Sequence, residues 1–172
     1  MPIRLFGDPV LRTPARDVET FDDLLAKLCD DMLETMYEAP GVGLAAPQVG
    51  LAIRFFVFDA GDGSGPNAIA NPVLSNLDGV QEDDEGCLSI PNLYFPTARA
   101  LSAHVTGQDV KGRPIELEGE ELIARIFQHE TDHVNGTLFI DRLAPDERRK
   151  AMAEIREREL GGWTRPLRRP TE

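Results

Sequence analysis

The sequence is short of cysteine, with only Cys29 and Cys87 among its 172 residues. The two lie in unlike surroundings, and a chain of this length can close a hydrophobic core without cross-links, so no framework disulfide is expected. The sequence also lacks any apolar run near the roughly 18 residues that cross a bilayer. Its first residues, MPIRLFGDP, lack the apolar stretch of a signal peptide. We therefore expect a cytoplasmic protein without a membrane partner.

Basic residues are scarce as well, with 18 Lys and Arg against 30 Asp and Glu and a formal net charge of -12. Such a protein repels a phosphate backbone, which argues against specific binding of nucleic acid. The imbalance is uneven: residues 1–144 hold 10 basic and 24 acidic residues, whereas residues 145–172 hold 8 and 6. The body is therefore acidic, and the C-terminal arm, defined here as residues 145–172, is mildly basic.

Hydrophobic residues make up 41% of the chain, which suits one globular unit. We expect a single domain over residues 1–172, with a core at 1–144 and a C-terminal helix and basic tail at 145–172. Apolar periodicity and turn residues predict an α+β fold, in which mainly antiparallel sheets wrap around a central helix and a C-terminal helix follows. The predicted helices span about 21–38, about 120–134 and 146 to near 161, and the predicted strands lie at 53–59 and on either side of a turn at 110–112. A short extended piece is expected at 137–140, and a loosely held tail from Trp163.

Two residues that could attract a functional interpretation are better explained by packing. Cys29 shares one face of the first predicted helix with Leu25 and Met32, which is typical of a buried helix face. His104 lies in a predicted strand, where a single histidine is usually half-buried. By contrast, residues 41–50 contain three glycines and no charge. This indicates backbone that passes close to a ligand or to another strand.

The most informative stretch is Gln128-His129-Glu130-Thr131-Asp132-His133. Histidines four residues apart project from one helix face and can chelate one ion. Glu130 is offset around the helix, so it can reach a water on that ion without being a ligand. The alternative to a metal site is a solvated helix turn that carries two ordinary histidines. However, the apolar residues in the turns before His129 indicate a buried helix, where unpaired polar groups are costly. The stretch therefore predicts the H-E-x-x-H arrangement of metal-dependent hydrolases.

A catalytic ion needs a third protein ligand, and the residues alone leave more than one candidate. The metzincin pattern is excluded, because Phe139 stands where its histidine would be. A thermolysin-like pattern would use Glu154 or Glu157. Cys87, in a glycine-flanked turn, would offer a strong thiolate ligand. A purely structural metal site would need a fourth ligand, for which His104 is the remaining histidine.

Three blocks in order resemble the signature motifs of the peptide deformylases. They read Gly41-Val42-Gly43-Leu44-Ala45-Ala46-Pro47-Gln48, then Glu85-Gly86-Cys87-Leu88-Ser89, then Gln128-His129-Glu130-Thr131-Asp132-His133. Flanking pieces agree, including Asp8-Pro9-Val10-Leu11-Arg12 and Gly136-Thr137-Leu138-Phe139-Ile140-Asp141. The similarity covers about residues 3–143.

The resemblance implies an enzyme that removes the N-formyl group from the formyl-methionine end of newly made polypeptides. It implies metal ligation by Cys87, His129 and His133, with ferrous iron as the native metal. The donor set also accepts zinc, nickel or cobalt, so these could occur in purified protein. Glu130 is implied as the general base and acid.

Further roles follow from the same resemblance. An oxyanion site is implied at the amide of Gln48 and the backbone N–H of Leu88. The implied substrate-binding positions are Val42, Gly43, Glu85 and Leu122, and the implied supporting residue is Arg99, paired with Glu85. Val42, Leu88 and Leu122 are candidate walls of a methionine pocket.

The chain departs from the family pattern in two places. No family contact is carried over to residues 92–98, which read Asn-Leu-Tyr-Phe-Pro-Thr-Ala. The C-terminal arm lies outside the similarity, and its charge run reads first as a solvated helix face. Because a deformylase meets chains as they emerge, and some bacterial relatives bind ribosomes through this helix, a weak ribosome tether is a second interpretation.

Overall fold

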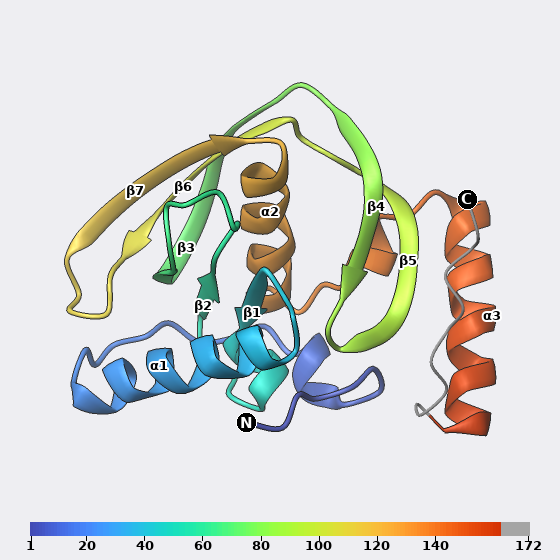
Figure 1. Ribbon diagram of the computed structural model, residues 1–172, viewed down its shortest axis with the longest axis horizontal. Coiled ribbons are helices and arrows are strands. Elements are labelled where there is room, and N and C mark those ends of the chain that lie inside the picture. The colour runs from blue at the N-terminus through green and yellow to red at the C-terminus, as the bar shows by residue number, and fades with distance from the viewer. Residues whose placement is uncertain (163–172) are drawn as a thin grey trace.

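The computed structural model describes residues 1–162 (Figure 1). The tail that the sequence predicts to be loosely held, from Trp163, lies outside the described residues, as do Arg165, Arg168 and Arg169 of the basic arm. The α-helices are α1 (Asp23–Glu38), α2 (Leu122–Val134) and α3 (Pro145–Gly161), and short 3₁₀ turns are η1 (Pro9–Arg12), η2 (Ala46–Val49) and η3 (Phe139–Arg142).

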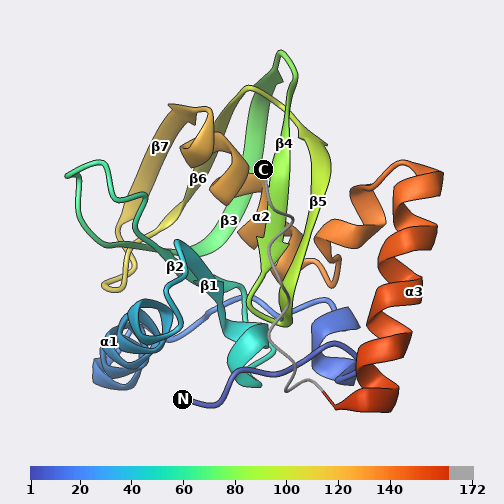
Figure 2. The same ribbon diagram turned by 45° about the vertical axis from the view of Figure 1, so that its right-hand side comes forward.

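The strands of residues 1–162 form two antiparallel sheets. They are β1 (Gly43–Ala45), β2 (Phe55–Phe58), β3 (Asn67–Asp78), β4 (Gln81–Cys87), β5 (Ile90–Arg99), β6 (Ser102–Gln108) and β7 (Pro114–Glu120). One sheet has the order β1-β2-β3-β6-β7, and β4 pairs with β5 in a separate hairpin. Figures 1 and 2 show α2 enclosed between the two sheets. The predicted α+β architecture around a central helix is therefore confirmed.

Helix α1 follows the predicted pattern closely. Asp22 caps its first turn by accepting a hydrogen bond from the backbone N–H of Leu25 at 3.1 Å. Its apolar residues recur at helical spacing and face the core, with Cys29, Met32 and Met36 all buried. Cys29 thus packs as a small hydrophobic residue, as the sequence predicts.

Helix α2 differs from an ordinary amphipathic helix because it is buried almost all round, from Ala124 to Val134. It ends at Asn135-Gly136, where Gly136 adopts a φ of 78° and lies so close to Arg12 that an added Cβ would be 2.8 Å from the Arg12 carbonyl oxygen. Both the positive φ and the close approach require glycine. Burial of residues 124–134 places polar side chains in a region where each needs a partner.

The expected extended piece at 137–140 is wrong in its second half. Phe139 begins the 3₁₀ turn η3 instead. The Asp141 carboxylate accepts the backbone N–H of Leu138 at 3.0 Å, and the Asp141 N–H donates to the Leu138 carbonyl at 2.9 Å. These local hydrogen bonds close a turn. The β-branched and aromatic composition of residues 137–140 is typical of a strand, and this is why the sequence predicts one.

Helix α3 begins at Pro145, which suits the first helical position. It packs beside β5 (Figure 1). Ala151 and Ile155 are completely buried in a core cluster that also contains Leu11, Cys87 and Leu93. The arm's helix is thus integrated into the core. Within the described part of the chain, no helix is long and apolar enough to cross a membrane.

Candidate metal centre and substrate cavity

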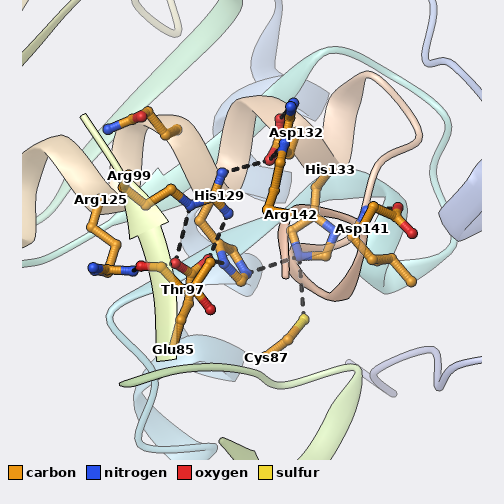
Figure 3. Close-up of polar contacts among 12 residues, drawn as sticks. Glu85, Cys87, Thr97, Arg99, Arg125, His129, Asp132, His133, Asp141 and Arg142 are labelled. Carbon is orange, nitrogen blue, oxygen red and sulfur yellow. Dashed lines mark hydrogen bonds and ion pairs between the residues drawn. The ribbon is translucent and has the colours of Figure 1, made fainter. Parts of the chain in front are cut away.

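The donor atoms of Cys87, His129 and His133 converge where the end of β4 meets α2 (Figure 3). The Cys87 Sγ lies 3.3 Å from His133 Nε2, which lies 3.2 Å from His129 Nε2. All three ligand atoms fall within 4.8 Å of one another, and among residues 1–162 this is the one such group of histidine, cysteine and acidic side chains. An ion bound about 2.0–2.3 Å from each atom would fit these separations.

Chain geometry explains how residues so far apart meet. His129 and His133 are one helical turn apart on α2, as the spacing predicts. Cys87 ends β4 and pairs with Ile90 across the Leu88-Ser89 turn, which carries it to the helix. Cys29 lies on α1, and burial raises the pKa of its thiol to about 11, which is the opposite of what a thiolate ligand requires.

The charge balance of the three donors favours a cation between them. Burial lowers the pKa of His129, but hydrogen bonds to Cys87 and Glu85 outweigh this and raise its pKa well above the ordinary value. Burial and the charge of His129 lower the pKa of His133 well below its ordinary value, so the pair holds one positive charge at a time. A metal ion that replaces the proton on His129 would leave both imidazoles neutral and able to ligate. A soft thiolate with two imidazoles suits a divalent transition metal. The donor set therefore fits one metal ion.

Glu130 projects from α2 beside these donors. Its Oε2 is buried and has no hydrogen-bond partner among residues 1–162. Burial raises the pKa of Glu130 to about 7. An unpartnered buried carboxylate beside a donor cluster needs a water or a ligand to satisfy it. These properties suit a group that exchanges protons near neutral pH.

The segment before η2 lies directly against these side chains. A Cβ added to Gly43 would clash with Glu130 Oε1, and one added to Gly41 would lie 2.7 Å from Leu88 Cδ1. Gly41 and Gly43 therefore confirm a close approach of the backbone, but to α2 and the β4–β5 turn rather than to a ligand or another strand, and Gly50 lies against the Arg4 side chain.

Gln48 is held rigidly next to Cys87. Its amide oxygen accepts the backbone N–H of Ala45 at 2.9 Å. Its amide nitrogen faces Ser89 Oγ at 3.1 Å and Cys87 Sγ at 3.6 Å. Because the oxygen is occupied by backbone, the NH₂ group is fixed as the end that faces the donors. Leu88 follows Cys87 and also lines the cavity described below.

Glu85 lines the cavity described below and also contacts the Nδ1 side of the His129 ring. Its Oε1 accepts the His129 Nδ1–H at 2.5 Å, and it pairs with Arg99 at 2.6 Å (Figure 3). Burial alone would raise the pKa of Glu85, but hydrogen bonds from His129 and Arg99 lower it far below its ordinary value. Both carboxylate oxygens are occupied, because Oε2 also accepts from Arg125 at 2.6 Å. The geometry favours orientation of His129 over direct substrate contact.

Sequence reasoning missed the charged residues that complete this network. Arg125 lies one turn before His129, and the i,i+4 spacing could have suggested it. Asp132, within the histidine motif, accepts from Arg99 at 2.7 Å and from Arg142 at 2.8 Å. No local pattern pairs residues that come from β5, α2 and η3. Phe139, which replaces a metzincin histidine, instead packs on His129 with ring centroids 6.2 Å apart.

A cavity of about 540 Å³ opens above the donors. His129 and Glu130 form part of its lining, and Val42, Gly43 and Leu122 are among its walls. The exposed fractions of Val42 and Leu122 are 43% and 45%, so apolar surface is available at the rim. The size and mixed lining suit a small peptide segment.

The other ligand candidates lie elsewhere. Glu154 and Glu157 are exposed on α3, and Glu154 faces Arg158 at 3.4 Å. His104, on β6, contacts Ser75 and Glu116 at 3.2 and 2.8 Å. In the described residues none of the three belongs to the donor group. The thermolysin-like and structural-site alternatives therefore lose their ligands.

Comparisons with known proteins agree along most of the chain. A model of the polypeptide deformylase family matches residues 1–149. The chain is 53% identical over 163 residues to a peptide deformylase from Acidothermus cellulolyticus, covering 95% of this chain and 89% of that protein. The crystal structure of peptide deformylase from Thermus thermophilus matches with a TM-score of 0.88 and 47% identity, covering 93% of this chain and 95% of that chain. A Synechococcus elongatus peptide deformylase in complex with actinonin gives a TM-score of 0.83 and 40% identity, covering 90% of this chain and 86% of that chain.

An α+β fold built around a buried H-E-x-x-H helix, with a cysteine in the donor group, defines a metal-dependent hydrolase. Within that class, the chain belongs to the polypeptide deformylase family. It is an enzyme that removes the N-formyl group from newly made polypeptides and releases formate. The family resemblance predicted from the three motifs is thereby confirmed.

Proposed function

We propose that deformylation takes place in the cavity above α2, with Cys87, His129 and His133 as the ligands of one divalent ion. The convergence of these three buried donors carries the proposal. When bound there, such an ion would lower the pKa of a water at its open position toward ~7 and polarise a carbonyl oxygen.

Glu130 is the general base and acid of this proposal. Its unpartnered Oε2 and its pKa of about 7 support the role, because the carboxylate can accept a proton from the attacking water and deliver it to the leaving amine. Gly43 keeps the carboxylate in place, since any larger residue would displace it.

The oxyanion that forms at the formyl carbon is stabilised by the Gln48 amide and the Leu88 backbone N–H. The fixed orientation of the Gln48 NH₂ supports this role, because it is held on the side of the donors, where its long contact with Cys87 Sγ at 3.6 Å can be exchanged for the oxyanion. Selectivity for formyl over acetyl would follow if the backbone at Gly41 to Gln48 packs against the bound carbonyl and leaves no space for a methyl group.

The methionine side chain occupies a pocket walled by Val42, Leu88 and Leu122. Their position on the cavity supports the assignment. Glu85 and Arg99 act from behind: their buried pair orients His129 and so keeps its Nε2 directed at the ion.

Ferrous iron is the native metal in this proposal. The donor set of one thiolate and two imidazoles also accepts zinc, nickel or cobalt, so occupancy depends on supply. Metal analysis after anaerobic purification, followed by reconstitution of the apo-protein, tests the choice. Iron-loaded protein should turn over fastest; equal or higher activity with zinc would remove iron as the native metal.

The enzyme works in the cytoplasm on nascent chains, as one domain in which the core 1–144 is completed by the arm. A weak tether to the ribosome through basic residues of α3 would raise the local concentration of emerging chains. Arg149 and Lys150 support it by being largely exposed, with side-chain exposures of 75% and 66%.

The direct experiment is deformylation of N-formyl-Met-Ala-Ser, measured as the release of formate. N-acetyl-Met-Ala-Ser is the matched control. Turnover of the formyl peptide alone is expected, together with about one metal per chain. Because a relative was solved with actinonin, that compound should inhibit the reaction. Absence of turnover in metal-replete protein would refute the proposed site.

A further inference from the structure

The β4–β5 hairpin changes register beside Cys87. Gly86 pairs with Tyr94, yet the next residue, Cys87, pairs with Ile90. Residues 91–93 therefore have no partners on β4 and form a bulge in β5. Bulges of this kind bend a strand and redirect its side chains, and they recur next to active sites.

The bulge forms part of the substrate cavity. Pro91, Asn92 and Tyr94 line it, opposite the histidine helix. Leu93 points the other way and is 1% exposed, in the same core cluster as Cys87. Asn92 has a φ of 59°, in the left-handed region. The conformation of this segment therefore needs external support.

Arg158 of α3 supplies that support. Its guanidinium donates from Nη1 to the Pro91 carbonyl and from Nη2 to the Asn92 carbonyl at 3.0 Å. These are two carbonyls at the register shift of the ladder. The Arg158 side chain is only 10% exposed, and Glu154 lies at 3.4 Å to balance its charge. A planar, two-pronged donor suits two successive carbonyls better than an ammonium group.

The helix that carries Arg158 is itself fixed. Ile155, three residues earlier, and Ala151, a further turn back, have no exposed surface and pack in the cluster with Ile90 and Leu93. The arginine is therefore anchored to the same cluster as the strand that it holds. Figure 2 shows α3 on the side of the hairpin away from α2.

We propose that Arg158 is a positioning residue for the substrate cavity: it holds the bulge at residues 91–93 and so makes the C-terminal helix part of the peptide-binding wall. The inference rests on the proposed function, since it takes this cavity as the place where the formyl peptide binds. Arg158 touches neither the donors nor the reacting atoms, so it acts through the bulge on peptide affinity.

The first test measures the stability of the bulge directly and does not depend on enzyme activity. In amide hydrogen exchange, Arg158→Gln should accelerate exchange at Tyr94 and Phe95, the paired residues that directly follow the bulge, by about tenfold and leave β6 and β7 unchanged. Arg156→Gln is the matched control, because Arg156 is exposed on the same helix. Equal exchange at Tyr94 and Phe95 in both variants would overturn the proposal.

The second test is kinetic. With N-formyl-Met-Ala-Ser, Arg158→Gln should raise KM by about tenfold, with kcat within about twofold and the metal content unchanged. Arg158→Lys keeps the charge but loses the two-pronged geometry, and should lie between Gln and wild type. An unchanged KM in both variants refutes the role, and so does a parallel loss of kcat, metal and thermal stability, which would indicate general structural damage. Absence of wild-type turnover would instead refute the proposed function, while the exchange measurement would still decide whether Arg158 holds the bulge.

Discussion

At the scale of single residues, the two cysteines show how the surroundings give the same type of side chain two different roles. Cys87 lies at a strand end facing two imidazoles, whereas Cys29 lies on an apolar helix face where burial raises the pKa of its thiol to about 11. A cysteine sulfur beside two imidazoles completes a donor set for a transition metal, whereas apolar burial disfavours the thiolate form that a metal requires. The difference predicts opposite consequences for the same substitution.

Cys87→Ala should lose most of the bound metal and nearly all activity, because one ligand of three disappears. Cys29→Ala should keep both and lose only about 1 kcal/mol of stability through the small cavity it leaves. Metal content per chain and a thermal melt measure both outcomes. A metal-replete, active Cys87→Ala protein would contradict the ligand assignment.

A substitution at Glu130 distinguishes metal ligation from proton transfer. Glu130→Gln keeps the size of the side chain but cannot take up a proton, so turnover should fall roughly 10²- to 10⁴-fold while metal content stays near that of wild type. Parallel measurement of metal and kcat checks this. Near-normal turnover would show that another group handles the proton.

At the scale of elements, β1 affects the site because its first residue, Gly43, has no side chain. Gly43 lies against Glu130, and a methyl group there would clash with its carboxylate. Gly43→Ala should therefore lower kcat by about 10²-fold, since displacement of a reacting group by about 1 Å costs that much. Gly161→Ala is the control, because an added Cβ there meets nothing within 4 Å. Equal kcat in the two variants would mean that the Glu130 side chain can move without harm.

The local sequence was sufficient to predict helices and strands, because their apolar residues recur once per helical turn or at every second position. The apolar spacing of α1 and the glycine, cysteine and histidine blocks were all recognisable, and the structure has His129 and His133 on the predicted helix. The 3₁₀ turn at Phe139 was not, because a single side-chain bond from Asp141 decides it.

The bulge at residues 91–93 and its contact with Arg158 were also invisible. A register shift leaves no periodic signal, and Arg158 meets the carbonyls of residues 66 and 67 positions earlier in the chain. Contacts of that separation depend on the assembled fold, as do the Glu85–Arg125 and Asp132–Arg142 pairs. The chemistry of the site was therefore more predictable than the scaffold that orients it.

At the scale of the whole molecule, one core cluster joins Leu11 near the N-terminus, the β4–β5 hairpin and α3. We propose on this basis that the core and the arm's helix unfold together as one domain. Ile155 is completely buried, so Ile155→Ala should destabilise the protein by about 2–5 kcal/mol, whereas Glu157→Ala on the exposed face should stay within about 0.5 kcal/mol. A single denaturation transition in both is expected; a second transition would divide the chain into two units.

The ribosome tether has to be tested without removal of the helix, because deletion of α3 would expose the core cluster that contains Cys87. Charge reversal of the exposed residues Arg149, Lys150 and Arg156 leaves Ala151 and Ile155 in place. If the tether exists, this triple variant should lose salt-sensitive co-sedimentation with ribosomes, since each lost cation removes one phosphate contact, while hydrolysis of N-formyl-Met-Ala-Ser stays near that of wild type. Reversal of Lys27, Lys111 and Arg113, which are exposed on the acidic body, is the control, because it changes the net charge by the same amount. Equal co-sedimentation of both variants and wild type would leave the basic residues of α3 as an ordinary solvated helix face.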